Sequence, residues 1–561
     1  MSKVCIIGMD GGTFTAIDYL IAQGRMPNMA RLIKTGSRAT LMSTVPPLTW
    51  PAWASFYTGT NPGKTGASDL FKFQAGTYKL EPMNAGNIRG VPIWSLAGDS
   101  GKRVCVYNVP VTYPAIPVNG ILVSGLDAPS FNDRAIYPLE QKEELLAKVP
   151  DFQITFENDA KYLVTHHKDP IGEWIRQANA FMDMELRTID YLMHLEDWDL
   201  FATVIRSTDI IPHTHWRMAE KVIDGESVTA EEQVRAEAVF NCYEVVDRKL
   251  GEIAANLGPD KNLVIMSDHG FGRMRGTVCV NRVLAEAGLL KFHPVSSRSR
   301  TLDFVKKQLK THLSLENKQR VRRMLGKDRL DSRWTIYVDT LIAEIDWSQT
   351  KICAIGGFGN LYLNLKDRDP MGIVGGEDER RAVIEAADAA LRELKDPWDG
   401  EPILTRSYRK EELFHGPCLP ELPDMVLNLR NWSYCPVIGT ANELSAEALI
   451  RPPVQQWKQL AHTGTHRREG ILIMNGPDIA ASDIGVAQMV DIAPTVMNLL
   501  GLPAYEEWDG KILEAAMSNG SARSVDDSRK YRQAGEEETA SAYSSQDEEE
   551  VRKHLEDLGY L

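Results

Sequence analysis

Residues 46–66 read Pro46-Pro47-Leu48-Thr49-Trp50-Pro51-Ala52-Trp53-Ala54-Ser55-Phe56-Tyr57-Thr58-Gly59-Thr60-Asn61-Pro62-Gly63-Lys64-Thr65-Gly66. The first two prolines disfavour helix in the residues before them, and Pro51 suits the first turn of a helix. Thr49 is therefore expected at a helix N-terminus, where free N–H groups and the helix dipole attract an anion such as phosphate. Taken alone, such a threonine is more often a helix cap than a nucleophile. Acidic and imidazole side chains elsewhere in the chain favour the nucleophile.

The composition indicates a large, acidic, soluble protein. The 561 residues can bury a large core, either as several domains or as one enlarged α/β domain. With 77 acidic and 63 basic residues, the net charge of -14 argues against a nucleic-acid polymer as partner. No apolar run approaches a membrane span, and Val4–Gly8 is too short for a signal peptide. We therefore expect a cytoplasmic protein without a membrane partner.

The cysteines predict neither a disulfide framework nor a zinc knuckle. They are scattered, odd in number and contain no CxxC pair. Reduced, mostly buried thiols are expected at these seven positions: Cys5, Cys105, Cys242, Cys279, Cys353, Cys418 and Cys435.

Short apolar runs alternate with helical patterns along most of the chain. Buried strands are predicted at Val4–Met9, Arg103–Asn108, Ile121–Ser124, Leu200–Arg206, Asn262–Ser267 and Ile471–Asn475. Helices are predicted from Pro27 to Gly36, from Asp169 to about His194 and from about Ala230 to Leu257. This alternation predicts an α/β fold, with a mostly parallel central sheet and helices on both faces. In such sheets, ligands collect beyond the carboxyl ends of the strands.

A basic segment interrupts this pattern. Ser296–Arg333 is rich in lysine and arginine and carries an apolar stripe at helical spacing. We expect an inserted helical region, over residues 296–350, at the edge of the sheet. A solvated helix face is the simpler interpretation, and a lid over an anionic substrate is the alternative.

The C-terminal part of the sequence is different again. Residues 518–545 are polar and rich in Ser, Glu and Arg, which predicts a flexible linker after a main domain of residues 1–517. A short helix is expected over residues 546–561, with Ser545 and Glu548 as its capping box. Its apolar stripe predicts docking, either on the same chain or on a partner.

Four fragments place acidic or imidazole side chains at strand ends. Each alone is commonly structural, since an Asp at a strand end often caps a helix and a lone His often lies in the core. Their side chains are Asp10; Asp209 and His213; Asp268 and His269; and His466. Mixed Asp and His ligands suit Zn²⁺ or Mn²⁺ better than Mg²⁺ or Ca²⁺. Together with the Thr49 hydroxyl, these groups are too many for one tetrahedral zinc and suit two metals.

In this order the motifs resemble the type I phosphodiesterase/nucleotide pyrophosphatase family of the alkaline phosphatase superfamily. The resemblance runs from Val4 to about Ala516 and implies an alkaline-phosphatase-like catalytic domain. The motifs that carry it are Asp10-Gly11, Thr49 to Gly66, Thr208-Asp209 with His213, Ser267-Asp268-His269-Gly270 and Gly464-Thr465-His466.

The resemblance also implies a site and a reaction. One divalent ion would be held by Asp209, His213 and His466, and the other by Asp10, Asp268 and His269, with Thr49 bound to the second ion as the nucleophile. Zinc is the first expectation and manganese the second. Metal binding would lower the pKa of the threonine hydroxyl. The implied reaction is hydrolysis of phosphodiester or pyrophosphate bonds in a small, nucleotide-like phosphate ester, through a phosphothreonine intermediate.

Several features leave the substrate open. Asp69 stands in the region where nucleotide pyrophosphatases carry an Asn that helps bind a phosphate oxygen. Residues 49–53 contain neither the Cys nor the Ser that a sulfatase matures into its nucleophile. His215 and His462 are near the expected ligands without a metal role. A phosphomonoesterase or phosphotransferase on the same core, and a non-catalytic binding protein of the same fold, remain as alternatives; the complete ligand set argues against the latter.

Overall fold

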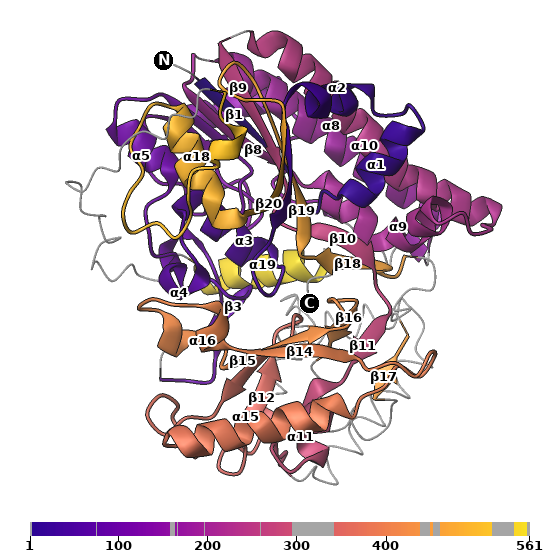
Figure 1. Ribbon diagram of the computed structural model, residues 1–561, viewed down its shortest axis with the longest axis vertical. Helices are drawn as coiled ribbons and strands as arrows, with labels where there is room; N and C mark the ends of the chain where they lie inside the picture. The colour runs from indigo at the N-terminus through magenta and orange to yellow at the C-terminus, as the bar shows by residue number, and fades with distance from the viewer. Residues whose placement is uncertain are drawn as a thin grey trace, which may run out of the picture.

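The protein is described here by a computed structural model that covers residues 3–293, 342–518 and 543–557, except 75, 158–162, 165, 196, 259, 438–448 and 453–459. At its centre is a nine-stranded sheet in the order β20-β2-β19-β9-β1-β8-β5-β6-β7 (Figure 1). The strands are β1 (Lys3–Met9), β2 (Ser37–Met42), β5 (Val104–Tyr107), β6 (Gly120–Val123), β7 (Ile136–Tyr137), β8 (Leu200–Ile205), β9 (Lys261–Met266), β19 (Glu469–Asn475) and β20 (Ser482–Gln488).

The sheet is mostly parallel, as predicted. The strands β9, β1, β8, β5 and β6 pair in parallel with one another, and β2 pairs in parallel with β20. The strands β19 and β7 run antiparallel to their neighbours. All six predicted strands are present within two residues of their expected bounds. The predicted α/β architecture is therefore confirmed, whereas β2, β7 and β20 were not predicted.

Helices cover both faces of the sheet, because strands buried on both sides need apolar cover. One face is covered by α3 (Thr49–Thr58), α5 (Ile93–Asp99) and α18 (Ile492–Leu499). The other is covered by α1 (Phe14–Ala22), α2 (Pro27–Thr35), α8 (Pro170–Leu195), α9 (Ser207–Ile223) and α10 (Ala230–Leu257). The predicted helices correspond to α2, α8 and α10.

Helix α3 is the helix predicted within residues 46–66. It begins at Thr49, its N-cap residue is Leu48, and all ten of its residues are buried. It ends at Thr58, and its C-cap Gly59 adopts the left-handed conformation with φ of 66° that glycine takes without steric cost. Thr49 is thus the first residue of the helix and not its N-cap.

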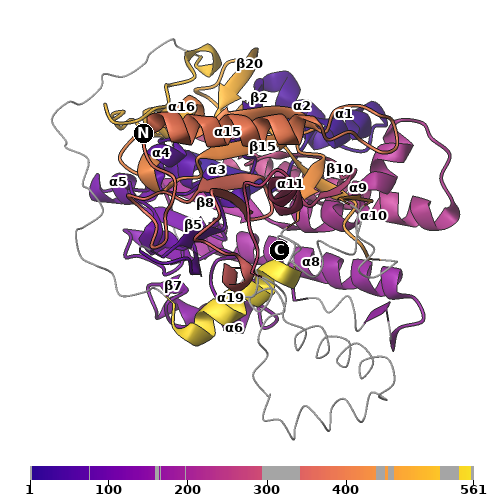
Figure 2. The same ribbon diagram turned by 90° about the horizontal axis from the view of Figure 1, so that it is seen from below.

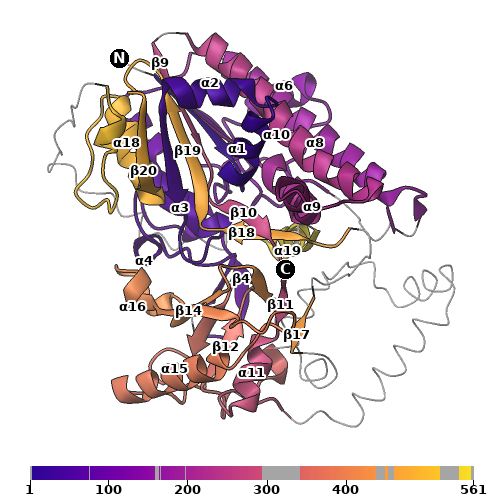
Figure 3. The same ribbon diagram turned by 45° about the vertical axis from the view of Figure 1, so that its right-hand side comes forward.

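A smaller lobe lies beyond the carboxyl ends of the parallel strands. It contains an antiparallel sheet in the order β12-β13-β15-β14, with α15 (Glu377–Arg392) and α11 (Val280–Glu286) on its outer side (Figure 2). Its strands are β12 (Ile352–Ile355), β13 (Asn360–Leu363), β14 (Leu404–Arg409) and β15 (Met425–Leu429). A two-stranded ribbon of β10 (Gly270–Arg273) and β18 (Gly464–Arg467) lies between the main sheet and this lobe (Figure 3).

The C-terminal helix α19 (Ser545–Asp557) packs on the same chain, against β4 (Leu80–Pro82). Val551 and Leu555 are buried in the main core, and the buried Tyr543 donates a hydrogen bond of 2.7 Å to the Asp127 carbonyl. The capping box lies one residue earlier in the sequence than predicted. Asp547 N–H donates to Ser544 Oγ, and Ser544 N–H donates to Asp547 Oδ2, so Ser544 and Asp547 form the box in place of Ser545 and Glu548.

Two predicted segments lie outside the described residues. They are the basic segment Ser296–Arg333 and residues 519–542 of the expected linker. Residues 342–350 of the expected insertion are described, and Ile345 pairs with Phe292 in an isolated β-bridge.

Candidate metal centre

The seven predicted site residues lie together at the carboxyl edge of the main sheet. Asp10 follows β1, Asp209 and His213 lie on α9 directly after β8, and Asp268 and His269 follow β9. His466 lies on β18, and Thr49 begins α3. The neighbouring strands β8, β1 and β9 therefore each deliver a carboxylate to one place, as expected from parallel pairing.

The first predicted group is compact and joins α9 to β18. His213 Nε2 lies 3.2 Å from Asp209 Oδ1 and 3.1 Å from His466 Nε2. His466 Nε2 lies 3.6 Å from the same Asp209 oxygen. Because Asp209 and His213 are four residues apart on one helix, they share a face.

The second predicted group surrounds His269. Its Nε2 lies 3.3 Å from Asp268 Oδ2 and 3.6 Å from Asp10 Oδ1. His269 also lies beside Asp209 and His466, since one ligand atom from each of these three falls within 4.8 Å of the others. The rings of His269 and His466 stack with centroids 3.6 Å apart. His269 therefore lies between the two groups.

The three imidazoles share an orientation that suits metal binding. In each ring Nδ1 faces a backbone carbonyl oxygen: Gly464 for His213, Gly270 for His269 and Pro47 for His466, at 3.3, 3.0 and 2.9 Å. A ring that donates through Nδ1–H has a lone pair on Nε2, and a carbonyl partner of this kind commonly orients metal-binding histidines. All three Nε2 atoms face the carboxylates.

Charge in the centre is poorly compensated by protein groups alone. Asp10 Oδ1 and Asp268 Oδ2 are buried and accept no hydrogen bond from the described residues. Burial raises the pKa of Asp10 well above its usual value, and the carboxylates of Asp268 and Asp209 raise it further. Burial likewise raises the pKa of Asp268. Bound cations would offset this repulsion, so the residues present fit a metal centre.

In the group of Asp209, His213 and His466, imidazoles lie close enough to the carboxylate to stabilise its charge. Burial acts to raise the pKa of Asp209, but the neighbouring imidazoles, with His213 as the largest contributor, together outweigh burial and lower this pKa. Burial lowers the pKa of His466 well below its usual value, so this ring is neutral near pH 7. A neutral imidazole is the form that binds a metal.

Thr49 lies at the edge of this centre. Its side chain is fully buried, and Oγ1 lies 3.4 Å from His269 Nε2. The hydroxyl therefore faces the second group, where the resemblance places the nucleophile.

Several side chains that support the centre were not predicted. Glu185 on α8 is fully buried and accepts hydrogen bonds from the N–H groups of Arg206 and Ser207, which fixes the start of α9. Phe271 and Phe358 pack against the His466 ring. These contacts join elements that are far apart in the sequence, so local pattern does not predict them. The glycine-rich run around Phe358 is the one local signal, because it indicates an unusual loop.

His462 and His215, the two histidines expected near the ligands without a metal role, have different positions. His462 lies beside His213, with ring centroids 5.1 Å apart, and burial lowers its pKa to about 3. His215 is fully buried on α9 and packs edge-on against Trp174. Burial lowers the pKa of His215 to about 3 as well, so it is a neutral core residue.

Asp69 is buried beside the smaller lobe. It accepts a hydrogen bond of 2.7 Å from Asn360 Nδ2 on β13 and one of 2.6 Å from the Leu70 N–H. Burial raises its pKa from 3.8 to about 6. Asn360 follows the loop that holds Phe358 over His466, so Asp69 is linked to the centre through this loop.

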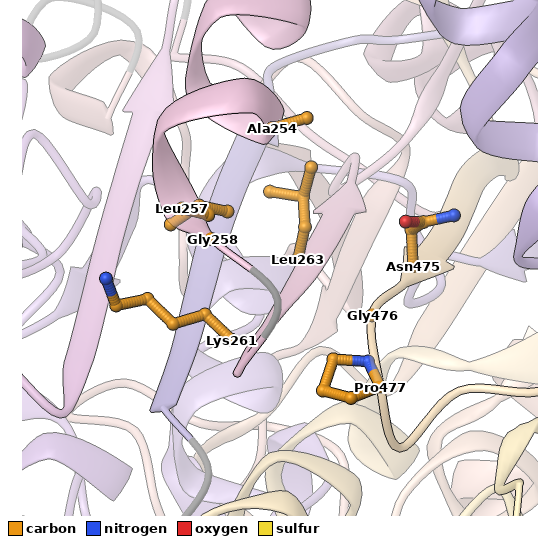
Figure 4. A pocket seen from close by; sticks show the side chains of 8 residues that line it. All are labelled: Ala254, Leu257, Gly258, Lys261, Leu263, Asn475, Gly476 and Pro477. Carbon is orange, nitrogen blue, oxygen red and sulfur yellow. The ribbon is translucent and has the colours of Figure 1, made fainter.

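A shallow depression of about 220 Å³ lies at the opposite edge of the sheet, between the end of α10 and the end of β19 (Figure 4). The Lys261 side chain extends away from Asn475 and Pro477 there. None of the predicted site residues lines it.

The fold and the centre together define an α/β protein with a candidate two-metal centre beside a helix-borne hydroxyl. The sequence profile of the type I phosphodiesterase / nucleotide pyrophosphatase family matches residues 4–434, and the chain belongs to this family. The family inferred from the motifs is thereby confirmed, while His466 lies beyond the matched range. No curated protein gives a significant match. A similar solved structure is human ectonucleotide pyrophosphatase / phosphodiesterase 5, at 12% identity over 92% of this chain and 100% of that chain, with a TM-score of 0.48.

Proposed function

We propose that this member of a phosphodiesterase and pyrophosphatase family hydrolyses phosphodiester or pyrophosphate bonds in a small, nucleotide-like substrate with two divalent metal ions. Zinc is the first candidate and manganese the second, because three imidazoles and three carboxylates form the donor set. The observation that carries the proposal is the convergence of three histidine Nε2 atoms on buried carboxylates, beside the Thr49 hydroxyl.

The proposed ligand sets are those that the family resemblance implies. Asp209, His213 and His466 would hold one ion, and Asp10, Asp268 and His269 the other. Bound ions would lower the pKa of the threonine hydroxyl and offset the negative charge on the phosphoryl group. The backbone carbonyls of Pro47, Gly270 and Gly464 would keep the imidazoles oriented.

In this proposal Thr49 Oγ1 attacks the phosphorus atom as the bond to the leaving group breaks. Water then attacks the phosphothreonine from the opposite side and releases the phosphoryl product. The buried start of α3 fixes Thr49 in the centre, which favours attack by the hydroxyl over attack by a free water molecule.

Metal content and substrate choice test the proposal. Elemental analysis of metal-replete protein should give two divalent ions per chain, and Asp268→Ala should leave one of them weakly held. The purified protein should turn over bis-p-nitrophenyl phosphate faster than p-nitrophenyl phosphate. The reverse preference would favour a phosphomonoesterase or phosphotransferase, whereas metal binding without turnover of either compound would favour a binding protein.

A further inference from the structure

A second cavity, of about 400 Å³, lies between the main domain and the smaller lobe. Its walls come from the segment Met42–Val45, from α3 and α4 (Pro62–Thr65), and from β14 and α16 (Lys410–Leu413). Figure 1 shows α16 directly below α3 and α4. None of the seven predicted site residues lines this cavity, and its volume lies in the range of about 300–1,000 Å³ typical of small-molecule sites.

A cationic group in this cavity forms no ion pair with the described residues, and the Glu469 carboxylate acts on it only at longer range. Arg468 is partly buried, and no described carboxylate lies within 4.0 Å of its guanidinium. Its Nε donates a hydrogen bond of 3.1 Å to the Ser43 carbonyl, which fixes the side chain against the cavity wall. The second arginine in the lining, Arg406, is already paired with Glu412 at 3.0 Å.

Two buried hydroxyls in the lining also have unused hydrogen-bonding capacity. Ser43 and Ser55 are 2% and 0% exposed, and neither Oγ has a hydrogen-bond partner among the described residues. Buried hydroxyls are normally satisfied, so two such groups beside an unpaired guanidinium are informative. Both Oγ atoms are closed to solvent, so the oxyanion of a ligand reaches them only if the cavity wall shifts.

The rest of the lining is apolar. Val45, Phe414 and Met489 are buried, and the first two belong to a small hydrophobic cluster separate from the main core. An inorganic ion would leave this surface without a partner. A ligand with both an oxyanion and an apolar group would satisfy both parts of the wall.

We propose that this cavity binds a small organic anion, whose phosphate, phosphonate or carboxylate group pairs with Arg468 and whose apolar group packs on Phe414 and Val45. The cavity is a second ligand site, distinct from the metal centre. Val45 lies four residues before Thr49, and Arg468 lies two residues after His466. A ligand held here therefore contacts both segments that lead to the centre, and its binding stabilises the folded chain.

Calorimetric titration of the full, metal-loaded chain with phenylphosphonate tests the proposal. Wild type should show two binding events, one at the metal centre and one in the cavity. Arg468→Gln should remove the cavity event or weaken it at least about tenfold, because a charge-assisted hydrogen bond is lost. Asp268→Ala should instead weaken the metal-centre event. Arg31→Gln, at an exposed position on α2, is the matched control and should change neither.

Control ligands and a second variant show which part of the ligand and which side chain account for binding in the cavity. Phenol should not compete for the cavity, and inorganic phosphate should bind there more weakly than phenylphosphonate. Arg468→Lys keeps the charge and should restore part of the affinity, which guards against a folding defect in Arg468→Gln. A single event in wild type that Asp268→Ala removes, or two events that both persist in Arg468→Gln, would overturn the proposal. If wild type showed the cavity event but no metal-centre event, the result would count against the proposed function and would still support the cavity site.

Discussion

Replacing Thr49 by alanine separates a nucleophile from a structural threonine. The change removes a buried γ-methyl group, worth about 0.8 kcal/mol of apolar burial. It also removes a hydroxyl whose contact with His269 Nε2 is long, at 3.4 Å. With a small cavity cost, the expected loss in unfolding free energy is about 1–2 kcal/mol. A protein of ordinary stability stays folded after such a loss.

The kinetic effect expected of a nucleophile is much larger. Without Oγ1 no bond to phosphorus can form at residue 49, and kcat should fall about 10⁴-fold. At 1.36 kcal/mol for each factor of ten, this is about 5.5 kcal/mol of activation free energy. Partial unfolding by the expected loss of stability cannot produce a deficit of that size. Thr49→Ser keeps the attacking oxygen and should retain most of the activity.

The same helix offers a matched control. Thr58 is also fully buried, and its Oγ1 donates to the Ala54 carbonyl at 2.6 Å and contacts Thr60 Oγ1 at 2.9 Å. Thr58→Ala should cost at least as much stability as Thr49→Ala and leave kcat essentially unchanged. The assay is turnover of bis-p-nitrophenyl phosphate by folded, metal-loaded protein, with mass spectrometry of acid-quenched wild type for a phosphorylated or nucleotidylated Thr49 peptide. Near-normal turnover in Thr49→Ala together with no adduct would refute the covalent mechanism.

Two further perturbations test the electrostatics and the packing. Asp69→Asn should gain stability over wild type as the pH rises from about 4 to 7, because the folded pKa of about 6 lies above the usual 3.8 and ionising this buried carboxyl costs about 3 kcal/mol. Urea unfolding at several pH values measures the difference, and a constant gap would contradict burial as the cause. Leu555→Ala on α19 should cost about 2–5 kcal/mol, because this side chain is fully buried, whereas exposed Gln546→Ala should cost little. Equal thermal stability of the two variants would mean that α19 does not belong to the core.

The sequence was most informative where local pattern and burial agree. The apolar run of β1 is buried along Val4–Met9 and lies between two parallel neighbours, so its composition reflects its position directly. The edge strand β20 is largely exposed, and its residues Ser482–Gln488 carry no continuous apolar signal. Pattern therefore identified the central strands and missed both edge strands, β20 and β7, together with β2 beside one edge.

The candidate centre was predictable to the extent that its residues lie next to strands. Its supporting contacts were not, because they depend on long-range packing. Glu185 reaches the start of α9 from another helix, and Asp69 bonds to Asn360, which is 291 residues away. Nothing in the sequence around Glu185 distinguishes it from a solvated glutamate on a helix. Tertiary structure alone reveals that it is buried.

The position of His466 required a strand direction that the alternation pattern did not supply. Asp10, Asp209 and Asp268 follow their strands, and so lie at the carboxyl edge of a parallel sheet. His466 precedes its strand, and before a parallel β19 it would lie at the opposite edge. Instead β19 runs antiparallel to β9, with Leu472 opposite Met266 and Asn475 opposite Leu263. The start of β19 therefore lies beside the end of β9, and β18 pairs with β10 to bring His466 opposite Phe271. One reversed strand thus brings an imidazole from the C-terminal part of the chain to carboxylates that follow β1, β8 and β9.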